Sequence, residues 1–227
     1  RLIGHKLVKT FGGKLRFFGI GGSKMDTNVE EFLKKCKFPY AVGYGLTETA
    51  PLVCNVLVNK KKRVGSIGIA AYKVEIRLDN QDPKTGEGEI VCRGDNVMLG
   101  YYKDPERTMQ VLDENGWFRT NDIASMDKDG YYYIRGRLNN TILGPSGENI
   151  YPEEIEMVIN DMDGVDESLV MERDGELVAL VKFDDNVLNW NQAYEDQFFE
   201  KVESMKKSVL DFVNRAVGKN SKIGKVE

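Results

Sequence analysis

The pattern of hydrophobic and polar positions begins with two short apolar runs on either side of an amphipathic segment. The runs are residues 15–20 (LRFFGI) and 39–44 (PYAVGY), and the segment between them is 26–36 (DTNVEEFLKKC). Short apolar runs predict strands, whereas apolar residues three and four positions apart predict a helix. The order strand, helix, strand predicts a βαβ unit with two parallel strands.

The segment 26–36 carries the signals of a helix start and of one apolar face. Asp, Thr and Asn open it, as is typical of helix N-termini, and it ends before Pro39. Its apolar residues fall on one side of the predicted helix: Val29, Phe32, Leu33 and Cys36.

From about residue 56 the pattern changes to short alternating runs, which predict antiparallel strands. Turn signals separate the runs at Thr85-Gly86, Asn115-Gly116 and Asp129-Gly130. One short helix is predicted within DPERTMQVL, with Asp104 as its cap and Pro105 in its first turn.

Residues 139–227 predict a small α+β unit. A helix is expected from Pro152, followed by a hairpin that turns at Asp174-Gly175. A long amphipathic helix should end near Gly218. Its apolar stripe is predicted to contain Phe198, Val202, Met205, Val209 and Phe212. The three patterns predict a mixed α/β and α+β fold divided into residues 1–55, 56–138 and 139–227.

Composition narrows the possible chemistry. The net charge of −4 disfavours a broad nucleic-acid surface. The basic run 59–63 is local, and it can be read as a solvated turn or as a contact with phosphate or acidic lipid. His5 is the single histidine, which excludes histidine-based triads and multi-histidine metal sites. The cysteines Cys36, Cys54 and Cys92 lack metal-ligand spacing, so we expect packing residues in a reducing cytoplasm.

Two glycine clusters follow the two N-terminal strands, at the sheet edge where open α/β folds bind ligands. They are Gly21-Gly22-Ser23 and Gly43-Tyr44-Gly45, and neither matches a phosphate loop or a dinucleotide fingerprint. Tight turns alone would explain the glycines equally well. The residues after them change this, because Thr47 can donate to a phosphate oxygen and Glu48 can bind Mg²⁺.

Three further side chains suit a nucleotide. Tyr44 offers a flat ring for stacking on a purine. Asp122 can accept ribose hydroxyls, and Arg137 is a charged donor. Each also has an ordinary structural alternative, namely strand-end packing, a turn and an ion pair.

Five motifs in order resemble those of the adenylate-forming superfamily, which includes acyl-CoA synthetases, peptide-synthetase adenylation domains and luciferases. YGLTETAP (44–51) resembles its phosphate-binding signature. The others are RFFGIGGSKM (16–25), GEGEIVCRGDNVMLGYYKDPE (86–106), GWFRTNDIASMDKDGYYYIRGR (116–137) and GPSGENIYPEEIE (144–156). The overall pattern is most similar to that of bacterial long-chain fatty acyl-CoA ligases.

The resemblance implies an architecture and a reaction. The architecture is a βαβ remnant of the large N-terminal domain, a β-barrel-like subdomain and a small C-terminal α+β lid. The reaction joins a fatty acid to ATP, giving acyl-AMP and pyrophosphate, and then transfers the acyl group to CoA. The implied cofactors are therefore ATP/AMP, Mg²⁺ and CoA.

The resemblance also implies roles for individual residues. Gly22 and Ser23 would border the adenine, Tyr44 would stack on it, and Asp122 and Arg137 would hold the ribose. Around the phosphates, Thr47 would bind the α-phosphate with the backbone at Gly45, Glu48 would bind Mg²⁺, and Gly43 would line the approach of the acyl carboxylate.

The sequence departs from the family at four places. Asn121 replaces a glycine in a tight turn, which Asn can tolerate through left-handed geometry. Asn139 stands at the implied hinge, where the family has Lys or Asp. Neither the upstream β,γ-phosphate loop nor the downstream catalytic lysine is found, so we expect a piece that is inactive alone.

Alternative functions remain open. Within the family, the substrate could be another carboxylate, namely an aryl acid or an amino acid. Alternatively, the chain could be a non-catalytic nucleotide-binding or interaction module with the same fold. The expected partners are small molecules, with no nucleic acid. Peripheral membrane contact and self-association, which uncovered apolar faces would favour, are left open.

Overall fold

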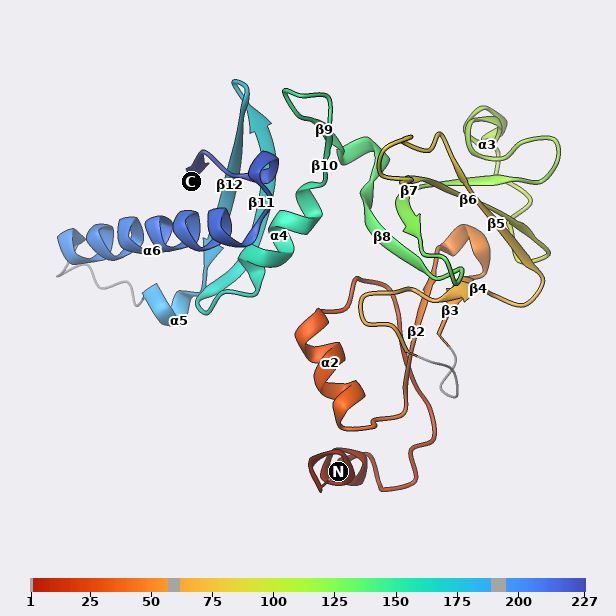
Figure 1. Cartoon of the computed structure of the whole chain (residues 1–227), viewed down its shortest axis with the longest axis horizontal. Helices are drawn as coiled ribbons and strands as arrows, with labels where there is room; N and C mark the ends of the chain where they lie inside the picture. The colour runs from red at the N-terminus through yellow and green to blue at the C-terminus, as the bar shows by residue number, and fades with distance from the viewer. Residues whose placement is uncertain (1, 57–61, 189–194) are drawn as a thin grey trace. The chain divides into compact units, whose positions relative to one another are not determined.

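The computed structural model describes residues 2–56, 62–188 and 195–227 (Figure 1). The chain folds as two compact units, Arg1–Leu138 and Asn139–Glu227. The three-part division predicted above stays a prediction. No helix within the described ranges is long and apolar enough to cross a membrane.

The first unit opens with the predicted βαβ arrangement. Helix α1 (Leu2–Thr10), which the sequence did not indicate, precedes β1 (Phe18–Ile20), α2 (Thr27–Lys35) and β2 (Tyr40–Gly45). β1 and β2 pair in parallel, with Phe18 opposite Tyr40, which confirms the predicted orientation. β3 (Leu52–Asn55) and β4 (Ile69–Ala70) continue the sheet antiparallel, in the order β1-β2-β3-β4.

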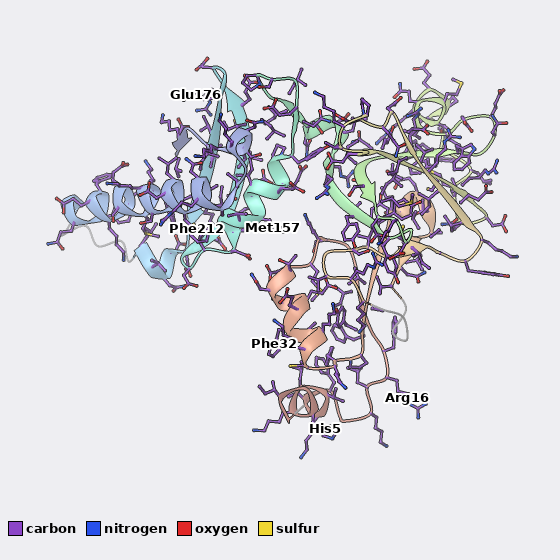
Figure 2. All side chains as sticks on the ribbon, viewed as in Figure 1. His5, Arg16, Phe32, Met157, Glu176 and Phe212 are labelled. Atoms are coloured by element: carbon purple, nitrogen blue, oxygen red, sulfur yellow. The ribbon has the colours of Figure 1, made fainter. Side chains whose placement is uncertain are left out.

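Helix α2 begins as the sequence predicts, but its apolar face is only partly covered. Asp26 caps it by accepting a hydrogen bond from the Val29 N–H at 2.7 Å. Val29 is 50% exposed and Phe32, which Figure 2 labels, is 46% exposed, whereas Leu33 packs against the buried residues of the sheet. The residue of α2 that is buried is Glu30. Its carboxylate accepts hydrogen bonds from the Tyr40 hydroxyl at 3.1 Å and from the Gly65 N–H at 2.7 Å. These two donors make burial of the carboxylate tolerable.

The rest of the first unit is an antiparallel sheet in chain order, β5 (Val74–Asp79), β6 (Gly88–Gly94), β7 (Phe118–Met126) and β8 (Tyr132–Arg137). The sheet is open, with β5 and β8 at its edges. The predicted turn glycines Gly86, Gly116 and Gly130 all have φ between 71° and 79°. Between β6 and β7 lies α3 (Pro105–Val111), capped by Asp104, which accepts from the Arg107 N–H at 3.0 Å.

All three cysteines are free thiols that serve as packing residues. Cys54 and Cys92 are fully buried together with Phe118 and Tyr132, and Cys36 is half-buried. This confirms the role expected from the sequence.

The second unit is a three-stranded sheet covered by two helices. The short 3₁₀ helix η2 (Leu138–Asn140) spans the boundary between the units. The elements that follow it are β9 (Ile142–Leu143), β10 (Asn149–Ile150), α4 (Pro152–Asn160), β11 (Val165–Arg173), β12 (Glu176–Phe183), α5 (Asp185–Leu188), α6 (Glu195–Ala216), η4 (Lys219–Ser221) and β13 (Lys225–Val226). β11 and β12 form the predicted hairpin around Asp174 and Gly175. β13, which the sequence did not reveal, pairs parallel to β12.

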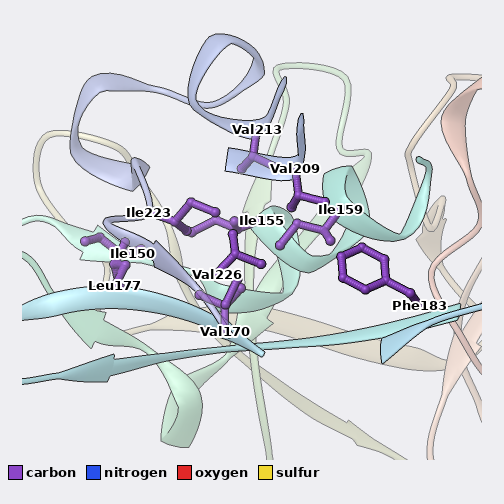
Figure 3. Close-up of a cluster of buried hydrophobic side chains, with 11 residues drawn as sticks. Ile150, Ile155, Ile159, Val170, Leu177, Phe183, Val209, Val213, Ile223 and Val226 are labelled. Carbon is purple, nitrogen blue, oxygen red and sulfur yellow. The ribbon is translucent and has the colours of Figure 1, made fainter. Parts of the chain in front are cut away.

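The core of the second unit shows that the predicted stripe of α6 was wrong at its C-terminal end. Val209 and Val213 are 2% and 0% exposed, whereas Phe212 is 43% exposed (Figures 2 and 3). The buried row steps by four residues from Met205 through Val209 and Val213 to Val217. Residues three and four apart share a helix face, so spacing alone did not distinguish residue 212 from 213.

The corrected face of α6 can be tested with neighbouring substitutions. We expect Val213→Ala to lower the free energy of unfolding by about 2 kcal/mol, because it leaves a cavity in the core. Phe212→Ala should cost less than about 1 kcal/mol, since it removes a partly solvated ring. Chemical denaturation followed by circular dichroism measures both. A larger loss for Phe212→Ala would mean that the helix is rotated from the described orientation.

Candidate functional site

A cleft of about 880 Å³ lies at the carboxyl ends of β1 and β2 in the first unit. The two glycine clusters lie side by side there. A Cβ added at Gly21 would come within 3.2 Å of the Gly43 carbonyl oxygen, which shows how close the two strand ends are. Parallel pairing of the two strands is the cause, since it brings their carboxyl ends to one edge. Of the predicted site residues, seven line the cleft: Gly22, Gly43, Tyr44, Gly45, Thr47, Glu48 and Arg137.

The turn after β2 is tightly folded and explains the need for glycine. A Cβ at Gly45 would lie 1.5 Å from the Pro51 carbonyl oxygen. Thr49 is fully buried in this turn, where its hydroxyl donates to the Pro51 carbonyl at 2.6 Å and accepts from the Leu46 N–H at 3.0 Å. The short 3₁₀ helix η1 (Thr47–Thr49) is thereby fixed, with Thr47 exposed at the cleft.

Glu48 is held from both its backbone and its side chain. Its carbonyl oxygen accepts from the Met98 N–H at 2.8 Å, and its Oε1 accepts from the Tyr101 hydroxyl at 2.9 Å. Within the described ranges, no group of three or more His, Cys, Asp or Glu side chains is placed to hold a metal ion. A single carboxylate nevertheless fits Mg²⁺, which usually takes one or two carboxylates together with waters and substrate phosphates.

Tyr44, Asp122 and Arg137 come together although they are far apart in sequence. The Tyr44 hydroxyl donates to Asp122 Oδ2 at 2.5 Å, and Arg137 Nε lies 2.9 Å from Asp122 Oδ1. Asp122 is 5% exposed and stands opposite Arg137 in the pairing of β7 with β8. Burial and the neighbouring Asp122 raise the pKa of the Tyr44 phenol, so it keeps its proton and remains a donor.

Two predicted residues are not part of this arrangement. Ser23 is exposed and lies outside the residues that line the cleft, although Gly22 beside it lines the cleft with φ of 93°. Asn139 begins the second unit, within η2, and its hinge role stays a prediction.

Asn121 adopts the left-handed backbone that its replacement of glycine required. Its φ is 63°, and its N–H donates to Glu89 Oε1 at 3.1 Å. The register of β7 against β6 is irregular across this residue, between Arg119 and Ile123, as at a β-bulge. The sequence expectation for Asn121 is therefore confirmed.

The sequence did not reveal the residues that hold the turn from the opposite side. Tyr101 reaches Glu48, and the Asn96 side-chain amide donates to the Thr49 and Leu52 carbonyls at 2.9 Å each. Both lie in the recognised motif 86–106, but local sequence pattern does not signal a contact to a residue some fifty positions away.

The described part of the basic run gives no support for an anion contact. Arg63 pairs with Asp127 and Asp129. Lys62 lies 3.7 Å from the centre of the Tyr40 ring and donates to a backbone carbonyl at 3.3 Å. Residues 59–61 lie outside the described residues.

The close approach at Gly45 leads to a first prediction for the site. Gly45→Ala should destabilise the first unit by about 3 kcal/mol, because the methyl group meets a backbone oxygen that cannot turn away. Gly19→Ala is the control, since its methyl meets only the edge of the exposed Phe17 ring at 3.2 Å. Chemical denaturation compares the two, and equal stabilities would contradict the described turn.

The backbone at Asn121 leads to a second prediction. Asn121→Ala should lose about 1 kcal/mol of stability, because alanine is strained in the left-handed region. Asn121→Gly should match or exceed the native stability, since glycine adopts this conformation freely. Denaturation midpoints give the order, and an alanine variant as stable as the native protein would exclude the left-handed backbone.

Sequence comparisons find a matching family and relatives of this chain. Residues 3–102 match the family model described as AMP-binding enzyme. Feruloyl-CoA synthase of Amycolatopsis sp. is 35% identical over 165 residues, which are 69% of this chain and 33% of that protein. The long-chain-fatty-acid–CoA ligase FadD13 of Mycobacterium tuberculosis is 34% identical over 193 residues, covering 82% of this chain and 37% of that protein. The chain spans roughly a third of the length of these relatives.

Solved structures show the same fold. ATP-bound MatB from Rhodopseudomonas palustris is 28% identical, with a TM-score of 0.72, covering 96% of this chain and 42% of that one. The o-succinylbenzoate–CoA synthetase MenE of Bacillus subtilis in complex with AMP has a TM-score of 0.75 at 21% identity, covering 98% and 45%. The predicted fold class is thus confirmed, and the chain belongs to the superfamily of AMP-binding, adenylate-forming enzymes.

Proposed function

We propose that this chain supplies the nucleotide side of the active site of an AMP-forming long-chain fatty acid–CoA ligase. Such an enzyme converts ATP, a fatty acid and CoA to acyl-CoA, AMP and pyrophosphate through an acyl-adenylate. The observation that carries the proposal is the cleft in which the η1 turn, the glycine ends of β1 and β2, and Arg137 meet.

The cleft offers the groups that formation of an adenylate requires. Attack of a carboxylate on the α-phosphorus builds negative charge on the phosphate oxygens. The Thr47 hydroxyl and the backbone N–H groups at the glycines would donate to these oxygens, and Glu48 would hold the Mg²⁺. When bound, that ion supplies positive charge that offsets the developing charge.

The trio of Tyr44, Asp122 and Arg137 would form the nucleoside side of the site. Asp122 lies behind the cleft lining, where Tyr44 and Arg137 hold its carboxylate, and as a charged acceptor it would accept a hydrogen bond from a ribose hydroxyl. Because both contacts fix the carboxylate, it requires little ordering when the nucleotide binds.

The choice of a fatty acid rests on the apolar part of the cleft and on the relatives. Phe17, Ile20, Val42, Leu52 and Val56 line the cleft beside the polar groups. Curated relatives include long-chain-fatty-acid–CoA ligases of Mycobacterium tuberculosis and Yersinia pestis, the latter 46% identical over 121 residues. An aryl acid is the second candidate, because feruloyl-CoA synthase matches at 35% identity.

The free thiols support a reducing, cytoplasmic location for this reaction. CoA as acceptor, contact with a membrane surface and self-association remain predictions from the sequence.

Nucleotide binding tests the proposal directly on this chain. Calorimetric titration with AMP should show saturable binding, and Asp122→Asn should weaken it about tenfold, because the charged acceptor is lost. Asp129→Asn, which removes an exposed carboxylate outside the cleft, should bind like the native chain. A folded native chain that does not bind AMP would contradict the proposal.

The acid is identified by pyrophosphate release from the whole protein that carries this sequence. Saturated acids of graded length and ferulate should be compared, and a maximum among long chains supports the fatty acid. A maximum with ferulate would favour the aryl alternative. Residues 1–227 alone should release no pyrophosphate, and nucleotide binding without acid-dependent release by the whole protein would indicate a binding module.

A further inference from the structure

Residues 96–101 form a clamp on the η1 turn, which we call the 96–101 clamp. Asn96 donates from one amide nitrogen to the carbonyls of Thr49 and Leu52, at 2.9 Å each. The Met98 N–H donates to the Glu48 carbonyl at 2.8 Å. The backbone at Glu48 and on its C-terminal side is therefore fixed by a segment that follows β6.

The clamp ends in a side-chain contact to the carboxylate itself. The Tyr101 hydroxyl donates to Glu48 Oε1 at 2.9 Å. Within the described part of the chain, Oε2 of Glu48 accepts no hydrogen bond, and Glu48 lines the cleft. One carboxylate oxygen is thus held by the protein, while the other remains for a ligand.

Tyr101 is in turn held by helix α3. Its N–H donates to Thr108 Oγ1 at 2.9 Å, and the Arg107 guanidinium lies 4.5 Å from the centre of its ring. Gly100 before it has φ of 147°, and a Cβ there would come within 2.8 Å of the Thr108 side chain. The Tyr101 backbone and ring are thus both in contact with α3.

We infer that Tyr101 is a positioning residue that holds the Glu48 carboxylate in place for Mg²⁺ bound with ATP. The inference rests on the proposed function. Glutamate has several rotatable bonds, so an unheld carboxylate must be ordered when the ion binds, and that ordering opposes binding. A fixed donor removes part of this cost before the nucleotide arrives.

Titration of the chain with ATP in the presence and absence of Mg²⁺ tests the inference. The native chain should bind ATP more tightly with Mg²⁺ than with EDTA. In Tyr101→Phe, the ratio of the ATP affinity with Mg²⁺ to that with EDTA should fall about tenfold, while the affinity in EDTA stays the same. A purely structural defect would instead weaken binding under both conditions.

Tyr102→Phe is the matched control. It is the adjacent residue, carries the same substitution and is 88% exposed, and the Lys103 ammonium lies 5.3 Å from its ring centre. It should keep the full Mg²⁺-dependent gain. Thermal unfolding of both variants should match that of the native chain, which separates the effect from misfolding.

A double-mutant cycle shows whether Tyr101 acts through Glu48. Glu48→Gln should lose the Mg²⁺-dependent gain, and adding Tyr101→Phe should then cost nothing further. Additive losses would overturn the inference, because Tyr101 would then act by another route.

Failure of the inference and of the proposed function give different results. If the native chain shows the Mg²⁺-dependent gain and Tyr101→Phe retains it, Tyr101 is not a positioning residue and the proposed function stands. If the folded native chain binds ATP in neither condition, the proposed function is wrong and the inference falls with it.

Discussion

The site depends on the parallel pairing of β1 with β2. This pairing places two glycine-rich strand ends so close that the Gly21 and Gly43 main chains nearly touch. Side chains at these positions would fill the space at this edge of the sheet, so the absence of Cβ atoms leaves room there for the proposed nucleotide. The strand ends alone, however, would leave the surrounding polar groups unordered.

Two long-range hydrogen bonds supply that order. Tyr44 on β2 reaches Asp122 on β7, and Glu48 after β2 receives Tyr101 from the segment before α3. The first contact ties the first sheet of this unit to the second, and the second contact ties the η1 turn to the segment between β6 and α3, so the polar groups of the cleft do not rest on one loop. Sites held between rigid elements keep their geometry better than sites on loops alone.

Local sequence carried the βαβ order, the helix caps at Asp26 and Asp104, and the left-handed Asn121, because short-range sterics and hydrogen bonding decide each of them. Local sequence could not predict the contacts between residues that are far apart along the chain. The burial of Glu30 depends on Tyr40 and a backbone N–H, and Tyr101 became relevant only when folding brought it to Glu48. On α6, residues 212 and 213 fit the helical period equally well, so the partner sheet decided between them.

The paired thiols at the centre of the first unit have a chemical consequence. Burial raises the pKa of Cys92 to about 12 and raises that of Cys54 further, so neither forms the reactive thiolate while the unit is closed. Alkylating reagents and peroxides should then attack these sulfurs only through transient opening of the sheet. The rate at which Cys54 and Cys92 are labelled therefore reports how often the first unit opens transiently.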